Sequence, residues 1–390
     1  MTKLVSKWNY PTTVRFGAGR ISELAEAVSS LGIKRPLFVT DPGLAKLPVV
    51  ARALKVLDDA KMPYGVFSEV KPNPVEANLT AGIAAWKKGK HDGAIVFGGG
   101  SALDLGKLIA FQAGQTRPVW DFEDVGDWWT RADASKIAPI VAVPTTAGTG
   151  SEGGRAAVLT NEATHTKKII FHPKLLPGIV IADPELTVGM PPFITAGTGM
   201  DAFAHCLEAY CSPGYHPMAD GIALEGMRLV FENLPKAFAD GKDITARAHM
   251  MSAAAMGATA FQKGLGAIHS LSHPIGALYD THHGMTNAVF MPYVLAFNRP
   301  AIEERLTRAA AYLGIRGGYD GFARAVLKLR KQLKVPNTLP ELVKGLDMDS
   351  KRKAMIAEAA VADPSTGTNP VKLTKKAALE ILRNSIDGKL

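Results

Sequence analysis

The sequence predicts an α/β domain in the first half of the chain and an all-α domain in the second half. Short apolar runs alternate with helical patterns as far as about residue 186, and this alternation indicates parallel strands covered by helices. Beyond residue 187 such runs mostly disappear, and Ala, Leu, Met and Glu dominate to the C-terminus. The length of 390 residues suits two domains, at roughly 150 residues per domain.

Four apolar runs in the first half are typical of buried strands. They comprise residues 36–41, 94–100, 140–146 and 179–186. Helical patterns are expected at residues 21–31, 48–61, 76–88 and 101–114, and the run YGVFSEV leads into a KPNP turn. This order of elements predicts a layered α/β architecture.

The segment TVGMPP at residues 187–192 is the predicted hinge, because Gly and paired Pro interrupt helices and strands alike. The predicted domains are therefore residues 1–187 and 188–390. Helices of the second domain are expected at residues 194–210, 218–238, 244–263, 300–313 and 321–333. The cleft between an α/β layer and a helical domain is a favoured place for a small-molecule site.

The composition is that of a globular protein, with 47% hydrophobic and 21% charged residues. The two cysteines, Cys206 and Cys211, exclude a disulfide framework and fit a reducing compartment. The N-terminal residues contain no apolar core of a signal peptide, and no apolar run approaches the ~20 residues of a membrane span. We therefore expect a cytoplasmic protein without a membrane partner.

The chain is basic, with 45 Lys and Arg against 36 Asp and Glu and a formal net charge of +9. The basic residues are scattered along the sequence, whereas a nucleic-acid footprint concentrates them on one face. A solvated basic surface is the expected explanation, and no nucleic-acid partner is predicted.

Two loops rich in glycine and hydroxyl groups follow predicted strands. Gly98-Gly99-Gly100-Ser101 lies between a strand and a helix, where backbone N–H groups and the helix dipole attract phosphate. It lacks the third glycine of a GxGxxG motif, because Leu103 occupies that position, and no GK[ST] indicates a P-loop. The second loop, residues 144–152, has hydroxyls suited to ribose or phosphate oxygens. Tight turns and helix caps remain the alternative explanation for both loops.

Asp41 ends the first predicted strand, at residues 36–41. A carboxylate at such a position accepts hydrogen bonds from a ribose 2′-OH and repels a 2′-phosphate. Capping of a helix that begins near Pro42 explains the residue equally well.

Histidine placement is the strongest signal, since four of the ten histidines fall between residues 269 and 283. Asp201 and His205 lie four apart, so that on a helix they share one face, and His269 and His273 repeat the spacing. The run His282-His283-Gly284 follows in a predicted loop. An Asp with several His suits Fe²⁺ or Zn²⁺. Peptidase chemistry is disfavoured because Ser270 replaces the Glu of an HExxH motif.

These motifs resemble those of the iron-containing (group III) alcohol dehydrogenases. The matching segments are FGAG (16–19), GGGSALDLGK (98–107), PTTAGTGSE (144–152), ADPELT (182–187), TGMDAFAHCLEAY (198–210), HSLSHPIGALYDTHHG (269–284) and DPSTGTNPVKLT (363–374). The resemblance covers nearly the whole chain in order. It implies a Rossmann-like nucleotide-binding domain followed by an all-α metal-binding domain, an architecture similar to that of dehydroquinate synthase.

The resemblance also implies roles for particular residues. The implied metal ligands are Asp201, His205, His269 and His283, and the implied cofactor contacts are Asp41, Asn73, Gly99, Gly100, Ser101, Thr145, Thr146 and Lys167. His273 resembles the catalytic histidine, and Pro274 supports a separate role because proline disfavours ideal helical geometry at the residue before it. The chain departs from the family pattern at Gly153-Gly154-Arg155, which leaves the substrate open.

The expected activity is hydride transfer between a primary alcohol, or a hydroxy acid, and NAD, with Fe²⁺ or alternatively Zn²⁺ in a site at the interdomain cleft. A homodimer or larger homo-oligomer is expected from the resemblance. A zinc-dependent polyol dehydrogenase of the glycerol type and a non-catalytic nucleotide-binding protein are the alternatives. A cyclising synthase is disfavoured because no dense set of Lys and Arg surrounds the histidines.

Overall fold

The computed structural model describes residues 12–164 and 166–390, which form two compact units. The α/β unit ends at Gly189, and the helical unit spans Met190–Leu390, so the two meet in sequence inside the segment 187–192. Residues 1–11, part of the segment without signal-peptide character, lie outside the described residues. Among the described residues, no helix combines the length and the apolar character that crossing a membrane requires.

The α/β unit contains a six-stranded, wholly parallel sheet. In spatial order its strands are β1 (Thr13–Phe16), β8 (Ile179–Ala182), β5 (Ile140–Pro144), β4 (Gly93–Gly98), β2 (Pro36–Val39) and β3 (Gly65–Phe67). The helices of this unit are α1 (Leu24–Ser30), α2 (Pro48–Asp59), α3 (Glu76–Gly89) and α4 (Gly100–Gln112). The predicted fold class is confirmed, since a parallel α/β layer precedes a helical unit.

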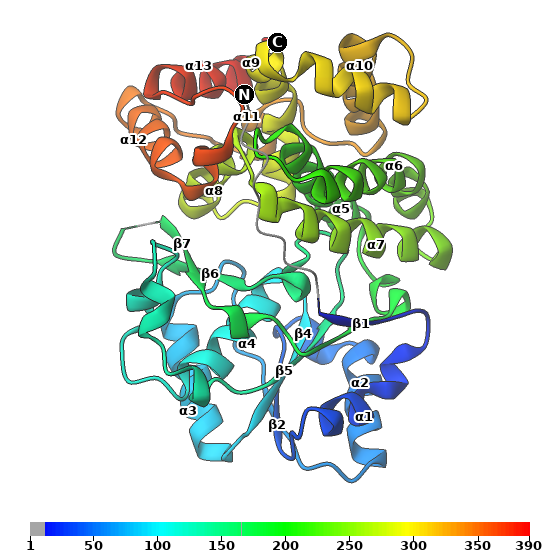
Figure 1. Ribbon diagram of the computed structural model, residues 1–390, viewed down its shortest axis with the longest axis vertical. Helices are drawn as coiled ribbons and strands as arrows, with labels where there is room; N and C mark the ends of the chain where they lie inside the picture. The colour runs from blue at the N-terminus through cyan, green and yellow to red at the C-terminus, as the bar shows by residue number, and fades with distance from the viewer. Residues whose placement is uncertain (1–11, 165) are drawn as a thin grey trace. The chain divides into compact units, whose positions relative to one another are not determined.

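Helices cover both faces of the sheet (Figure 1). Both faces are apolar because successive residues of a buried strand point to opposite sides. Phe38 and Phe97 stack at 5.2 Å and belong to the core cluster that includes residues of α1 and α2. Helix α4 packs on the other face, where a Cβ added at Gly106 would lie 2.3 Å from Val96 Cγ1. Glycine at position 106 therefore lets α4 approach the sheet closely.

The direction of strand addition reverses between β2 and β4. Strand β3 lies outside β2, whereas β4 returns to the opposite side of β2 and is followed outward by β5. In open α/β sheets, ligands bind at the carboxyl ends of the strands at such a reversal. Asp41 follows β2 and Gly98 ends β4, so the sheet topology brings the ends of these two strands together at this edge.

Two features of the α/β unit were not predicted from the sequence. Strand β1 lies at the sheet edge and is largely exposed, so it lacks the apolar run of a buried strand. Strands β6 (Ala156–Asn161) and β7 (Thr166–Phe171) form a separate antiparallel ribbon. Most of the ribbon residues are only partly buried, which explains why their sequence gives a weak strand signal.

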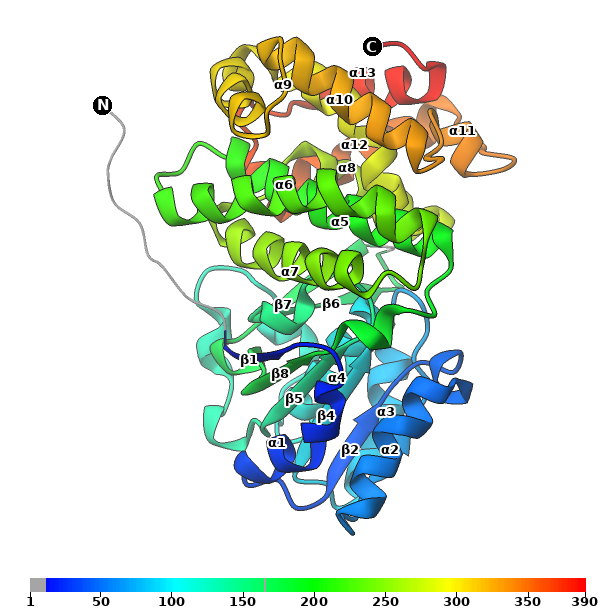
Figure 2. The same cartoon turned by 90° about the vertical axis from the view of Figure 1, so that its right-hand side faces the viewer.

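The helical unit is built around a buried helix, α5. Its helices are α5 (Pro192–Cys211), α6 (Pro217–Ala239), α7 (Ile244–Ala260), α8 (Ala267–Tyr279), α9 (His283–Tyr312), α10 (Gly318–Gln332), α11 (Leu339–Leu342), α12 (Ser350–Ala362) and α13 (Lys375–Asp387). Helices α5, α6 and α7 run side by side (Figure 2). Phe203 of α5 contacts Phe231 of α6 and Phe322 of α10, with ring centroids 5.1 and 6.4 Å apart.

Two sequence-based expectations were wrong in this unit. His283 and Gly284 are the first residues of helix α9 and do not lie in a loop. Helix α9 begins well before the predicted helix at 300–313 and continues through Pro292 and Pro300. Pro274 lies inside the continuous helix α8, so it does not take His273 out of the helix. In both cases the free energy gained by burying the helix exceeds the cost of the backbone hydrogen bonds that proline cannot donate.

Candidate functional site

Helix α5 carries the first two candidate metal ligands on one face. Asp201 and His205 are four residues apart, and both are buried, with 2% and 5% of their surface exposed. The helix is apolar nearly all round, so packing against α6, α7 and α9 fixes its position. The two side chains therefore project from a rigid element into the interior of the helical unit.

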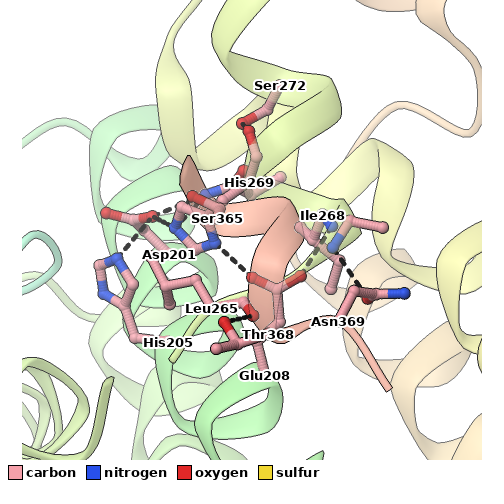
Figure 3. A network of polar contacts seen from close by, with 12 residues as sticks. Asp201, His205, Glu208, Leu265, Ile268, His269, Ser272, Ser365, Thr368 and Asn369 are labelled. Carbon is pink, nitrogen blue, oxygen red and sulfur yellow. Dashed lines mark hydrogen bonds and ion pairs between the residues drawn. The ribbon is translucent and has the colours of Figure 1, made fainter. Parts of the chain in front are cut away.

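Helices α8 and α9 bring two further histidines to the Asp201 carboxylate. The Nε2 atoms of His205, His269 and His283 lie 3.8, 3.7 and 3.5 Å from Asp201 Oδ1. Ligand atoms of Asp201, His205 and His269 all lie within 4.8 Å of one another (Figure 3). One carboxylate and three imidazoles from three helices form a donor set that fits a borderline divalent ion such as Fe²⁺ or Zn²⁺.

The charges of this cluster are strongly coupled. Burial alone raises the pKa of the Asp201 carboxyl, but the neighbouring imidazoles of His205, His283 and His269 lower it well below its usual range. Burial lowers the pKa of His269, yet the Glu208 charge and hydrogen bonds to Asp201 and Glu208 raise it to about 9. A metal ion bound by His269 therefore has to replace a proton.

Two glycines explain why His283, rather than His282, faces Asp201. A Cβ at Gly284 would lie 2.0 Å from the Gly197 carbonyl oxygen, and a Cβ at Gly197 would lie 2.5 Å from His282 Cε1. Because neither glycine has a Cβ, the first turn of α9 can approach α5 directly. His282 caps α9, because its Nδ1 accepts a hydrogen bond from the Met285 backbone N–H, while His283 Nε2 lies 3.5 Å from Asp201 Oδ1.

His273 lies one turn beyond His269 on α8 and contacts the same cluster. Its ring stacks on His283 with centroids 5.3 Å apart, and its Nδ1–H donates a 2.7 Å hydrogen bond to Asp363 Oδ2. Burial raises the pKa of the Asp363 carboxyl, but the charge and hydrogen bond of His273 lower it to about 2. His273 is thus held by an ionised carboxylate and keeps partial exposure, at 15% of its side chain.

Sequence reasoning missed three polar residues of this site. Glu208 Oε2 accepts a 2.6 Å hydrogen bond from His269 Nδ1, and Asp363 holds His273. Asn287 Nδ2 donates to Asp201 Oδ1 at 2.8 Å and lies 3.2 Å from the Nε2 atoms of His269 and His283. Spacing could have identified two of them, since Glu208 lies seven residues after Asp201 and Asn287 four after His283, on the same helix faces.

The predicted cofactor loops of the α/β unit meet at the reversal point of the sheet. Gly98, with φ of +150°, ends β4, and a Cβ on it would lie 3.8 Å from Asp41 Oδ2. Asp41 Oδ1 accepts hydrogen bonds from the Gly43 and Leu44 N–H groups, so the helix-capping role is present. Its second oxygen is directed to the glycine-rich turn.

The glycine-rich turn packs on the threonine loop. A Cβ at Gly99 would lie 3.2 Å from Thr146 Cγ2, and one at Gly100 would lie 2.6 Å from Thr149 Cγ2. Buried Thr145 joins the two loops, since its N–H donates to the Gly98 carbonyl. Helix α4, whose first turn includes Ser101, has no side-chain cap at its N-terminus. Its first N–H groups therefore suit an anion.

Asn73 and Lys167 lie on neighbouring segments at β6. Asn73 adopts the left-handed conformation, with φ of 51°, in the KPNP turn, and Pro74 accepts a hydrogen bond from the Thr160 N–H. Thr160 pairs with Lys167 across the ribbon. Lys168 Nζ contacts Glu123 at 2.8 Å, so Lys167 points to the opposite face of the strand.

A buried lysine ties the threonine loop to helix α4. Lys107 Nζ donates hydrogen bonds to the Ser151 carbonyl and hydroxyl, both at 2.9 Å, and to the Ala156 carbonyl at 2.5 Å. Ser151 Oγ in turn donates to Asp104 Oδ1.

Arg155, which breaks the family pattern, places its guanidinium over the Phe171 ring at 5.3 Å.

Two family models together match nearly the whole chain. Residues 11–184 match the model described as iron-containing alcohol dehydrogenase, and residues 195–386 match the C-terminal model of the Fe-containing alcohol dehydrogenase family. A 4-hydroxybutyrate dehydrogenase from Cupriavidus necator is 38% identical over 387 residues, covering 97% of this chain and 99% of that protein.

Further relatives support the same assignment. An NAD-dependent methanol dehydrogenase from Bacillus methanolicus is 34% identical over 385 residues, covering 96% of this chain and 98% of that protein. The crystal structure of a 1,3-propanediol oxidoreductase superposes with a TM-score of 0.91 at 34% identity, covering 98% of this chain and all of that one. Because family models, relatives and fold agree over both units, the chain belongs to the iron-containing alcohol dehydrogenases, a family of oxidoreductases that act on CH–OH groups.

Proposed function

We propose that the protein is an NAD-dependent, metal-containing dehydrogenase that interconverts a primary alcohol, or a hydroxy acid, with its aldehyde. The observation that carries this proposal is the convergence of three histidine Nε2 atoms on the single carboxylate of Asp201. Two of the three histidines are almost completely buried, so the cluster lies in the interior of the helical unit and is not a group of surface side chains.

Asp201, His205, His269 and His283 are the proposed ligands of a divalent ion, iron in the first instance and zinc as the alternative. These residues contribute one negative charge in total, so the loaded centre keeps a net positive charge that favours an alkoxide. When bound, the ion supplies a Lewis acid for the substrate oxygen, and NAD accepts the hydride.

His273 is the proposed proton carrier. Its Nδ1 is engaged by Asp363, which leaves Nε2 as the atom that takes up the alcohol proton and passes it to water. The ionised Asp363 stabilises the imidazolium that forms in this step. Stacking against His283 holds the ring close to the proposed ligands.

NAD is the proposed cofactor of the α/β unit. Gly99, Gly100 and Ser101, at the uncapped N-terminus of α4, are proposed to bind the pyrophosphate through backbone N–H groups. Asp41 is proposed to bind the ribose hydroxyls through Oδ2 and to disfavour the 2′-phosphate of NADP. The flanking contacts are proposed to come from Asn73, Thr145, Thr146 and Lys167, which lie on the adjoining loops and ribbon.

The substrate class is proposed from the relatives, which act on methanol and 4-hydroxybutyrate by their names. Both substrates carry a primary hydroxyl, the group that a Lewis-acidic ion binds. We further propose a homodimer or larger homo-oligomer in the cytoplasm. The state of Cys206 and Cys211, both free thiols, fits that compartment.

The test is reconstitution of metal-free protein with Fe²⁺ under anaerobic conditions and, separately, with Zn²⁺. NADH formation is followed over primary alcohols, diols, polyols and hydroxy acids, for the wild type and for His269→Ala. Turnover of primary alcohols or hydroxy acids with Fe²⁺, lost in His269→Ala, supports the proposal. Activity confined to zinc and polyols favours a glycerol-type dehydrogenase, and NAD binding without turnover on any substrate contradicts an enzymatic role.

A further inference from the structure

We propose that Glu208 is the positioning residue of the metal centre, because its carboxylate fixes His269 so that Nε2 rather than Nδ1 is presented to the ion. The inference rests on the proposed function, since it assumes that His269 is a ligand. Glu208 lies on α5, on the helix face of Asp201 and His205, so one helix supplies two proposed ligands and the group that orients a third.

The Glu208 carboxylate makes two short hydrogen bonds to consecutive residues of α8. Oε2 accepts from His269 Nδ1 at 2.6 Å, and Oε1 accepts from the Ile268 backbone N–H at 2.7 Å (Figure 3). Glu208 is 5% exposed and His269 is 1% exposed, so water does not compete for these bonds. Gly266 makes room for the carboxylate, because a Cβ there would lie 3.0 Å from Glu208 Oε1.

The partners of the two ring nitrogens agree on where the ring hydrogen lies. An ionised carboxylate only accepts hydrogen bonds, so His269 Nδ1 carries a hydrogen. On the other side of the ring, Nε2 lies 3.2 Å from Asn287 Nδ2, a donor whose second hydrogen can go to this atom or to His283 Nε2, and 3.7 Å from Asp201 Oδ1. The neutral ring consistent with both contacts has its lone pair on Nε2, on the side of the proposed ion. Carboxylates that hold metal-binding histidines in this way raise metal affinity.

A purely structural role for Glu208 is the competing explanation, because its bond to Ile268 N–H also caps the N-terminus of α8. Asn369 provides a matched control for that role. Its Oδ1 accepts from the Ala267 N–H at 3.0 Å, one residue earlier in the same helix turn, and the residue has no contact with His269 in the described structure. Loss of Asn369 therefore removes a comparable cap, together with hydrogen bonds to Asn298 and Val371, and removes no hydrogen bond of His269.

The discriminating variant is Glu208→Gln, which preserves size and keeps an oxygen for the Ile268 N–H. The amide nitrogen then faces His269 Nδ1 and donates to it, which moves the ring hydrogen to Nε2 and blocks that atom as a ligand. The affinity of the metal-free protein for Zn²⁺ or Co²⁺ is measured by competition with a chromophoric chelator. Thermal unfolding without metal is recorded alongside.

We expect Glu208→Gln to weaken metal affinity by roughly 10–100-fold and Asn369→Ala to lower the Tm at unchanged metal affinity. Glu208→Asp, which keeps the acceptor but withdraws it by one methylene, should fall between wild type and Glu208→Gln; it also serves as the test if Glu208→Gln does not fold. Unchanged affinity in the Glu208 variants, or an equal loss in Asn369→Ala, overturns the positioning role alone. Absence of metal binding by the wild type overturns the proposed function itself.

Discussion

The proposed metal cluster of the helical unit and the proposed cofactor loops of the α/β unit are built in opposite ways. In this cluster Asp201, His205 and His269 are buried and His283 is partly buried, and Asp201 Oδ1 lies within 3.8 Å of three imidazole Nε2 atoms. The loops consist mainly of backbone, and glycines allow them to pack against Thr146 and Thr149. A substitution in the cluster is therefore expected to remove a proposed ligand or a charge that no neighbouring group replaces, whereas one in the loops should change a graded preference.

The largest expected effect separates the two adjacent histidines at the start of α9. His283→Ala should abolish stable metal binding and dehydrogenase activity, because it removes one of the four proposed ligands. His282→Ala should keep metal affinity and lose only the helix cap, at about 0.5–2 kcal/mol of stability. Metal content after dialysis and the Tm of both variants check this prediction. Metal loss in His282→Ala with retention in His283→Ala would reverse the ligand assignment.

The second effect concerns the His273–Asp363 pair. Asp363→Asn should lower kcat by about 10–100-fold at unchanged metal content, because the imidazolium formed at His273 loses its counter-charge. Steady-state kinetics of metal-loaded protein provide the measurement, and Asn at 363 keeps the hydrogen bond to the Ser365 N–H. In a His273→Ala background the same substitution should change kcat little, and an undiminished effect there would exclude action through His273.

The third effect lies in the cofactor loops and is smaller. Asp41→Gly and Asp41→Asn should both relax the preference for NAD over NADP, by roughly tenfold or about 1.4 kcal/mol, because both remove the charge that repels a 2′-phosphate. Only Asp41→Gly should also lower the Tm, since Asn can still cap the Gly43 and Leu44 N–H groups. The ratio of kcat/KM for the two cofactors is measured, and unchanged discrimination in both variants would contradict the assignment of Asp41.

The last effect is a pH dependence of stability at Glu152. Burial raises the pKa of this carboxyl from 4.5 to about 7, with the Lys107 charge opposing the shift. The folded protein therefore binds more protons than the unfolded chain between these values, and stability falls as pH rises from about 4.5 to 7. At about 1.4 kcal/mol per pKa unit, this change corresponds to roughly 3 kcal/mol, and Glu152→Gln should remove this loss. Urea midpoints at pH 5 and pH 8 provide the measurement, and an identical pH dependence in variant and wild type would argue against a protonated Glu152.

The sequence predicted the buried strands better than the exposed ones. Strands β2, β4, β5 and β8 are buried along their whole length, so their apolar runs are unmistakable. Strand β1 pairs with β8, which is far away in the sequence, and the β6–β7 ribbon is mostly half-buried, so both show weaker local patterns. The start of α9 was missed for a similar reason, since its first turn depends on close approach to Gly197 of α5.

The alternation of buried strands and helices in the first half, and the types of residue proposed to hold a metal, could be predicted from the sequence alone, because periodicity and i, i+4 spacing are local properties of the chain. The family resemblance indicated His283, but only the fold shows His283 Nε2 next to Asp201 and His282 as a helix cap, and only the fold joins Glu208 to His269 and Asp363 to His273 across 61 and 90 residues. These contacts depend on how closely separate helices pack. That distance is set by buried glycines and apolar side chains whose partners lie far away in the sequence.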